Sequence, residues 1–169
     1  MNSPSATQAP PRDVDLLIRP GWVIPVEPAG VTLEGHSLAV DRGSIVALLP
    51  DAEARARFRP RQVVDLPGQV LLPGLVNLHT HAAMSLMRGF ADDLPLMRWL
   101  SERIWPAESR HADAEFVRAG PLLACAEMLR GGVTTFNDMY FFPEAAAEAA
   151  ERIGIRAVLG MIAIEFPTR

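Results

Sequence analysis

The stretch LLPGLVNLHTHAAMSLMRG, residues 71–89, decides the fold and points to the chemistry. Its centre, LVNLHTH, is an apolar run with the length and composition of a buried β-strand. Side chains at positions i and i+2 of a strand point to the same face, so His79 and His81 should project together, with Thr80 on the other face. Two neutral imidazoles on one face can bind one metal ion at about 2.0–2.1 Å each. The spacing alone is a weak indication, and the apolar strand with its Pro-Gly entrance makes a metal site the favoured interpretation.

An α/β pattern continues from this strand to the end of the chain. Apolar runs alternate with helical stretches, which predicts β-α-β-α-β with parallel strands covered on both faces. Asp113 is a candidate N-cap, and Pro121 should either kink the longer helix or divide it in two. The expected strands are LVNLHTH, VTTFNDMY (133–140) and IRAVLGMIAI (155–164); the expected helices lie in DAEFVRAGPLLACAEMLRGG (113–132) and PEAAAEAAERIG (143–154), after a long excursion, ADDLPLMRWLSERIWPAESRH (91–111).

The residues before this stretch have a different character. Residues 1–13 are expected to be a disordered lead-in without the features of a signal peptide. Residues 14–70 predict a small, mostly β module of short strands broken by turn residues such as Gly21. Asp41-Arg42-Gly43 is a strong hairpin signal, and residues 51–58 could form one or two helical turns.

Length and composition limit the possible functions. Residues 75–169 are enough for about three strands, whereas a complete eight-stranded barrel needs about 250 residues. The sequence therefore predicts the N-terminal part of a longer protein, with a complete small three-layer α/β domain as the alternative. The net charge is −4 and no basic run stands out, so neither nucleic acid nor an anionic membrane surface is an expected partner. The single cysteine, Cys125, is compatible with a cytoplasmic protein and is expected to be a buried structural thiol.

Several motifs together resemble the amidohydrolase superfamily. PGLVNLHTHAAMSLMRG is similar to the signature of the branch that contains adenosine-type deaminases and triazine hydrolases, while ADDLPLMRWL, IWPAE and FNDMYFFPE resemble S-adenosylhomocysteine / 5′-methylthioadenosine deaminases. The resemblance implies an α/β fold: the N-terminal part of a distorted (β/α)8 TIM barrel preceded by part of a β-sandwich. Residues 14–70 would be the first half of that sandwich, and residues 71–169 the first roughly three βα units of the barrel.

The same resemblance implies a set of site residues. Enzymes of this branch use one divalent metal, usually zinc, with Fe²⁺ or Mn²⁺ as alternatives. All basic residues here are arginine, so a carbamylated-lysine bridge between two metals cannot come from this chain. The catalytic acid/base is unknown and expected beyond residue 169. The matching positions are His79 and His81 as metal ligands, Glu108 as an acceptor for the ribose hydroxyls, Trp99 as a pocket aromatic, and Asp138 as a support for the metal shell.

Each assignment beyond the histidine pair has a plainer alternative. Glu108 could be a solvated acid after a turn, Trp99 could pack on the barrel as part of an amphipathic helix, and Asp138 could cap the next helix. His36 and His111 are expected to have no role in the site.

Some of these deaminases carry an arginine for a carboxylate-bearing substrate, and the resemblance places Met161 at that position here. This difference favours 5′-methylthioadenosine over S-adenosylhomocysteine as the substrate. Met84 and Met87 could contact an apolar thioether, although core packing is the favoured interpretation.

The leading functional hypothesis is therefore hydrolytic deamination of an adenosine-type thioether nucleoside, a small-molecule substrate, with a homo-oligomer left open. A guanine-type or triazine amino- or chlorohydrolase would keep the metal site and change the leaving group. A third hypothesis is that the 169-residue chain is a non-catalytic fragment, because two histidines are fewer protein ligands than a zinc site normally has.

Overall fold

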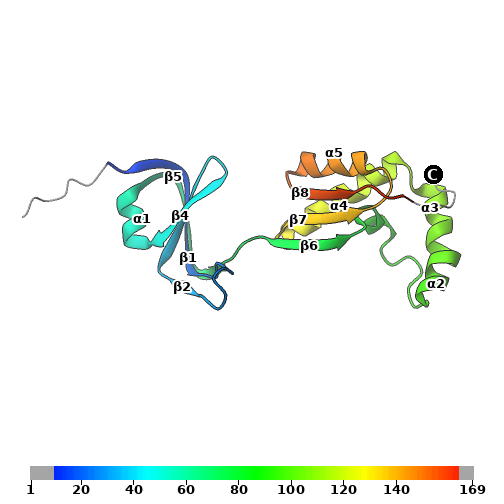
Figure 1. Ribbon diagram of the computed structural model, residues 1–169, viewed down its shortest axis with the longest axis horizontal. Helices are drawn as coiled ribbons and strands as arrows, with labels where there is room; N and C mark the ends of the chain where they lie inside the picture. The colour runs from blue at the N-terminus through cyan, green and yellow to red at the C-terminus, as the bar shows by residue number, and fades with distance from the viewer. Residues whose placement is uncertain (1–9, 164–169) are drawn as a thin grey trace, which may run out of the picture. The chain divides into compact units, whose positions relative to one another are not determined.

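The computed structural model describes residues 10–163 and divides into two compact units at the junction between Pro73 and Gly74. Each unit has its own sheet (Figure 1). Each also has its own cluster of buried apolar residues. They are called the N-terminal unit and the C-terminal unit below. None of the helices within residues 10–163 is long and apolar enough to cross a membrane.

The N-terminal unit is a five-stranded sheet with one short helix. Its strands run in the order β2-β1-β3-β4, and β5 pairs in parallel with β1. Val14, Leu17, Ala39 and Phe58 are buried in its core together with Ala54 of the helix. Its elements are β1 (Arg12–Val23), β2 (Leu33–Glu34), β3 (His36–Asp41), β4 (Ser44–Pro50), α1 (Asp51–Arg57) and β5 (Phe58–Leu71).

The two longest strands of this unit differ from the sequence prediction. The short strands expected on either side of Gly21 form one strand, β1, and β5 likewise continues through Pro67 and Gly68. The break at Gly21 is instead a shift in register between Pro20 and Trp22. A Cβ at Gly21 would lie 2.4 Å from the carbonyl oxygen of Pro67, so the glycine permits a close backbone approach. The turn residues here produce a local irregularity in the pairing without ending the strands.

The predicted hairpin between β3 and β4 is confirmed. Arg42 and Gly43 both have positive φ, 49° and 73°, between the paired residues Asp41 and Ser44. Positive φ at both central residues defines a type I′ turn, whose twist matches that of the flanking strands. The helix predicted directly after β4 is confirmed as α1.

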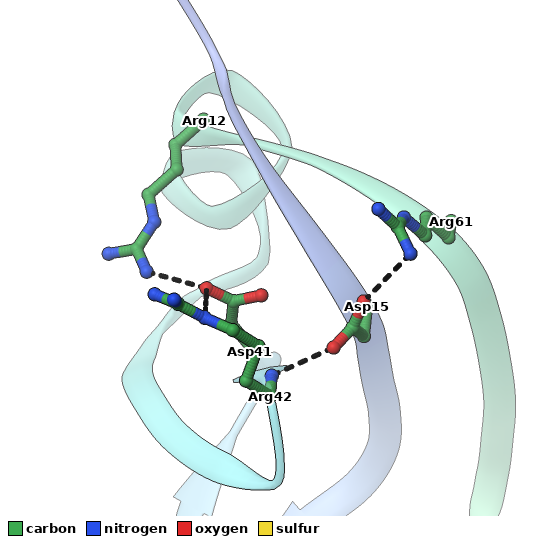
Figure 2. A network of polar contacts seen from close by, with 5 residues as sticks. All are labelled: Arg12, Asp15, Asp41, Arg42 and Arg61. Carbon is green, nitrogen blue, oxygen red and sulfur yellow. Dashed lines mark hydrogen bonds and ion pairs between the residues drawn. The ribbon is translucent and has the colours of Figure 1, made fainter.

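Ion pairs connect the strands of the N-terminal unit on its surface (Figure 2). Arg12 on β1 pairs with Asp41 at the end of β3 at 2.8 Å. Asp15 accepts a hydrogen bond from the backbone N–H of Arg42 at 2.7 Å and pairs with Arg61 of β5 at 3.4 Å. The turn is therefore tied to β1, and β1 is tied to β5, by side chains that stay in contact with solvent.

The C-terminal unit is built on three parallel strands in the order β6-β7-β8. The strands are β6 (Leu75–Thr80), β7 (Val133–Met139) and β8 (Arg156–Gly160), and the helices between them are α4 (Ala114–Arg130) and α5 (Pro143–Ile153). Phe136 of β7 is fully buried in a cluster with residues of α4 and α5, so both helices pack on the sheet face to which Phe136 points. The predicted β-α-β-α-β order is confirmed (Figure 1).

Helix α4 runs unbroken through Pro121, so the alternative of two shorter helices is wrong. Asp113 caps it as predicted, because its carboxylate accepts a hydrogen bond from the N–H of Phe116 at 2.9 Å. Gly120 lies against the segment that follows β6, where an added Cβ would be 2.5 Å from the carbonyl oxygen of Ala83. Gly120 therefore permits a close approach of α4 to this segment, and Pro121 beside it is fully buried.

The single thiol of Cys125 lies in the core between α4 and β7, as the sequence predicted. Burial, with a smaller contribution from the negative charge of Asp138, raises the pKa of Cys125 to about 11. A thiol with that pKa stays protonated at neutral pH, which is typical of a structural cysteine.

The excursion between β6 and α4 is mostly helical. A 3₁₀ helix, η1 (Ala82–Met87), follows β6 directly. A longer helical arm then consists of α2 (Leu96–Trp99), one π-helical turn, η2 (Leu100–Ile104), and α3 (Trp105–His111). Ile104 is buried at the centre of this arm, which therefore has a defined inner face.

Candidate active site

The two histidines converge at the end of β6. The Nε2 atoms of His79 and His81 are 3.4 Å apart, and the ring planes are nearly perpendicular with centroids separated by 5.2 Å. Two ligands that each bind zinc at about 2.0–2.1 Å in a tetrahedral site lie about 3.3 Å apart. The side chains therefore already have the separation that a shared tetrahedral metal requires.

The strand is irregular just before this pair. Between Asn77 and Thr80, β6 advances three residues while β7 advances two, so β6 contains one extra residue. The side-chain amide of Asn137 donates to the carbonyl of Leu78 at 3.1 Å, which satisfies a backbone acceptor at this point. Irregularities of this kind redirect side chains next to active sites.

A backbone contact orients the ring of His81. Its Nδ1 is 2.7 Å from the carbonyl oxygen of Met139 at the end of β7. A carbonyl only accepts, so this contact places a proton on Nδ1 and favours the tautomer in which Nε2, the atom near His79, has the lone pair. This is the arrangement that metal-binding histidines commonly have, with the second nitrogen bound to a carbonyl or carboxylate.

Asp138 lies beneath the pair without reaching it. Its side chain is almost fully buried, and Oδ1 accepts from the N–H of Ala82 at 2.8 Å and from the hydroxyl of Thr80 at 3.0 Å. These residues flank His81 on either side, so one carboxylate oxygen holds the backbone around the histidine. Asp138 does cap a helix, but that helix is η1, which begins at Ala82, and not α5, which follows it in the chain.

A cleft of about 840 Å³ opens beside His81 at the carboxyl ends of the strands. Its walls come from the helical arm on one side and from the ends of β7 and β8 on the other. Glu108 and Trp99 both line it, whereas His79 does not. The other lining residues are Met84, Leu96, Leu100, Ile104, Trp105, Asn137, Asp138, Met139, Tyr140, Phe141, Gly160, Met161, Ile162 and Ala163.

Glu108 is not a solvated acid after a turn. It lies within α3, is partly buried, and accepts a hydrogen bond from the hydroxyl of Tyr140 at 2.8 Å. Tyr140 is a residue of the cleft that was missed from the sequence. The available signal was its position two residues after Asp138 at the end of an apolar strand, where the active sites of parallel barrels are built.

The methionines and the other two histidines singled out in the sequence lie in different places. Met161 lines the cleft and is 89% exposed. Met84 lines the cleft and also packs against the core, while Met87 and His111 line a separate groove. His36 lies in the N-terminal unit, where its Nδ1 is 2.8 Å from the carbonyl oxygen of Glu34.

The histidine pair is suitable for a divalent metal but is not a full ligand set. Within residues 10–163, no group of three or more histidine, cysteine, aspartate or glutamate side chains is arranged to hold a metal ion. A zinc site normally has at least three protein ligands. The pair therefore provides two of the donors that such a centre would need.

A parallel α/β unit with paired histidines at the carboxyl end of its first strand has candidate metal donors where the active sites of βα-barrel enzymes are built. Residues 70–168 match the model of the amidohydrolase family. The chain belongs to the amidohydrolase family.

Named relatives extend this result. Over 155 residues the chain is 48% identical to the 5-methylthioadenosine/S-adenosylhomocysteine deaminase of Saccharophagus degradans, an alignment that covers 92% of this chain and 35% of the relative. The corresponding deaminase of Syntrophobacter fumaroxidans is 47% identical, with 91% and 35% covered. The chain thus spans about a third of the length of the curated relatives it matches.

Solved structures support the fold. One is a crystal structure of an adenosine deaminase from Xanthomonas campestris with bound zinc, which is 53% identical in sequence and has a TM-score of 0.92. The match covers 94% of this chain and 36% of that one. A triazine hydrolase from Arthrobacter aurescens is 28% identical with a TM-score of 0.73, over 85% of this chain and 35% of that one. The predicted fold class is confirmed: the chain is α/β and matches the N-terminal part of amidohydrolase barrel enzymes.

Proposed function

We propose that the natural polypeptide containing this chain is a metal-dependent hydrolytic deaminase of adenosine-type thioether nucleosides. The substrates would be 5′-methylthioadenosine, S-adenosylhomocysteine or both, and the products the inosine analogue and ammonia. The observation that carries the proposal is the 3.4 Å separation of the His79 and His81 Nε2 atoms beside a cleft lined by Glu108. The names of the similar deaminases support the choice of substrate class.

We propose that His79 and His81 hold one divalent metal, with zinc as the first choice. The support is their spacing and the zinc bound in the similar adenosine deaminase. When bound, such a metal lowers the pKa of a water molecule toward about 7 and so supplies hydroxide at neutral pH. The carbonyl of Met139 keeps the His81 ring in the tautomer that can bind, and Asp138 holds the backbone on both sides of it.

Glu108 and Trp99 are proposed to bind the nucleoside. A carboxylate only accepts hydrogen bonds, so Glu108 suits a pair of hydroxyl donors such as the 2′ and 3′ hydroxyls of ribose. Trp99 would contribute an apolar face to the same cleft. Met161, also in the cleft, cannot pair with a carboxylate, which favours 5′-methylthioadenosine over S-adenosylhomocysteine.

We also propose the domain assignment for the natural polypeptide. Residues 14–70 would be the first half of a β-sandwich and residues 71–169 the first three βα units of the barrel. The proton shuttle and the remaining metal ligands would lie outside residues 10–163.

The decisive experiment measures ammonia release and bound metal in the natural polypeptide with His81→Ala, using His111→Ala as the matched control. His81→Ala should lower both metal content and kcat/KM by more than the roughly 10–100-fold that follows loss of a residue supporting a ligand. His111 is exposed on the helical arm outside the cleft, so its variant should resemble the wild type. Full activity in His81→Ala would rule out the proposed metal site.

The substrate class has its own test. Glu108→Ala should raise KM for 5′-methylthioadenosine much more than for a free base, because only the nucleoside has ribose hydroxyls that can donate to Glu108. Equal turnover changes for nucleoside and free base would instead favour a guanine-type or triazine hydrolase. The 169-residue chain by itself is expected to bind zinc weakly and to release no ammonia, because two histidines are an incomplete ligand set.

A further inference from the structure

Tyr140 occupies a defined position between the histidine pair and the helical arm. It directly follows Met139, whose carbonyl accepts from His81, and its ring centroid is 6.4 Å from that of His81. The side chain is 7% exposed and packs against Phe141, with ring centroids 5.1 Å apart. These two ring contacts and the low exposure restrict the orientation of the phenol ring.

That hydroxyl reaches across the cleft to the helical arm. It donates to Oε1 of Glu108 at 2.8 Å, between residues that are 32 positions apart in the chain. A carboxylate only accepts hydrogen bonds, so in this contact the phenol hydroxyl of Tyr140 is the donor and Glu108 is the acceptor.

The way in which Glu108 is held differs from that of the surface carboxylates. Glu127, for example, receives Arg88 at both of its oxygens, at 3.0 and 2.6 Å. No arginine among residues 10–163 lies within ion-pair distance of Glu108, whose partner is a single neutral hydroxyl at one oxygen. A carboxylate has about four acceptor positions, so most of them are not used by Tyr140. In the described part of the chain no cation pairs with its charge.

We propose that Tyr140 is a positioning residue that fixes the Glu108 carboxylate as an acceptor for a vicinal diol and thereby sets the preference for ribonucleosides over 2′-deoxynucleosides. This inference rests on the proposed function of the cleft. The neutral donor orients the carboxylate without competing for its charge, so the strong charge-assisted hydrogen bonds are left for the substrate. Tyr140 itself does not contact the reacting atoms.

The experiment compares 5′-methylthioadenosine with its 2′-deoxy analogue in wild type, Tyr140→Phe, Glu108→Ala and the double variant of the natural polypeptide. Tyr140→Phe keeps the ring and removes only the hydroxyl. It should raise KM for the ribonucleoside by about 10-fold, the effect of one hydrogen bond, and change KM for the 2′-deoxy analogue by less than about twofold. The value of kcat should stay within about twofold for both. In the double variant, Tyr140→Phe should add nothing to the effect of Glu108→Ala, since the two residues act through one contact.

Arg118→Gln is the matched control, because it removes a 3.0 Å hydrogen bond to Glu148 outside the cleft. It should leave the preference for the ribonucleoside unchanged. If Tyr140→Phe keeps the full preference while Glu108→Ala abolishes it, the role of Tyr140 is wrong and the proposed function stands. If the wild type does not distinguish the two nucleosides, the ribose-binding role of Glu108 fails and the inference fails with it. An equal loss for both nucleosides in Tyr140→Phe indicates a merely structural role and also overturns the inference.

Discussion

The N-terminal unit connects its strands by ion pairs on the surface, whereas the C-terminal unit places a nearly buried carboxylate and a nearly buried phenol beside its candidate site. In the first, Arg59 and Asp13 face each other across β1 and β5 at 2.6 Å with both side chains largely exposed. In the second, Asp138 is 2% exposed and Tyr140 is 7% exposed, and both lie at the end of β7. The two kinds of interaction differ in their access to water. An exposed group that loses its partner can form hydrogen bonds with water instead, and a buried group cannot.

This contrast indicates where function lies. An exposed ion pair contributes little to stability and is a weak indication of a functional site. A buried carboxylate or phenol requires a partner to offset its desolvation, and in the C-terminal unit those partners are the segments that carry His81 and Glu108. The following substitutions test the contrast, beginning with the largest expected effect.

Asp138→Ala should have the largest effect on stability. It leaves the N–H of Ala82 without its partner in a buried position, and we expect a loss of about 3 kcal/mol in the free energy of unfolding. Metal affinity should also fall by about 10–100-fold, because the backbone around His81 is no longer held. Thermal unfolding and zinc titration of the natural polypeptide would measure both quantities.

Asp138→Asn is the control for this substitution, since its amide oxygen can still accept from Ala82. It should retain most of the stability that Asp138→Ala loses. Identical losses in the two variants would mean that the hydrogen bonds of Asp138 are not what supports the site.

Gly120→Ala should have an intermediate effect. The added Cβ would meet the backbone of Ala83 at 2.5 Å, and overpacking of this kind costs about 1–3 kcal/mol, offset by up to about 1 kcal/mol of improved helix propensity. Thermal denaturation should therefore show a net destabilisation of about 1–2 kcal/mol. Gly131→Ala, where the nearest atom is 3.4 Å away, is the matched control and should stay within about 0.5 kcal/mol of wild type. A stabilised Gly120→Ala would show that η1 does not pack closely on α4.

Arg61→Gln should have the smallest effect. The arginine side chain is 80% exposed, and its pair with Asp15 spans 3.4 Å (Figure 2). Exposed pairs contribute at most about 1 kcal/mol and many contribute nothing measurable. We expect no detectable change in unfolding temperature at physiological salt. A loss comparable to that of Asp138→Ala would remove the distinction between the two units.

Local patterns in the sequence predicted much of the fold. The hairpin at Arg42-Gly43, the cap at Asp113 and the alternation of strands and helices after residue 74 depend on near neighbours in the chain. The continuity of β1 through Gly21 and of α4 through Pro121 could not be predicted in this way. Both segments lie against distant parts of the chain, Gly21 against Pro67 and Gly120 against Ala83, and such long-range packing cannot be read from neighbouring residues.

The candidate site likewise has features that follow from local sequence and features that depend on long-range contacts. The sequence by itself predicted that His79 and His81 would project together, because a two-residue spacing places side chains on one face of a regular strand. Only the tertiary structure decided that the carbonyl of Met139 orients His81, that Asp138 holds the residues on either side of it, and that Tyr140 meets Glu108. Those contacts join segments that are 32 to 58 residues apart, and no local rule of spacing extends that far.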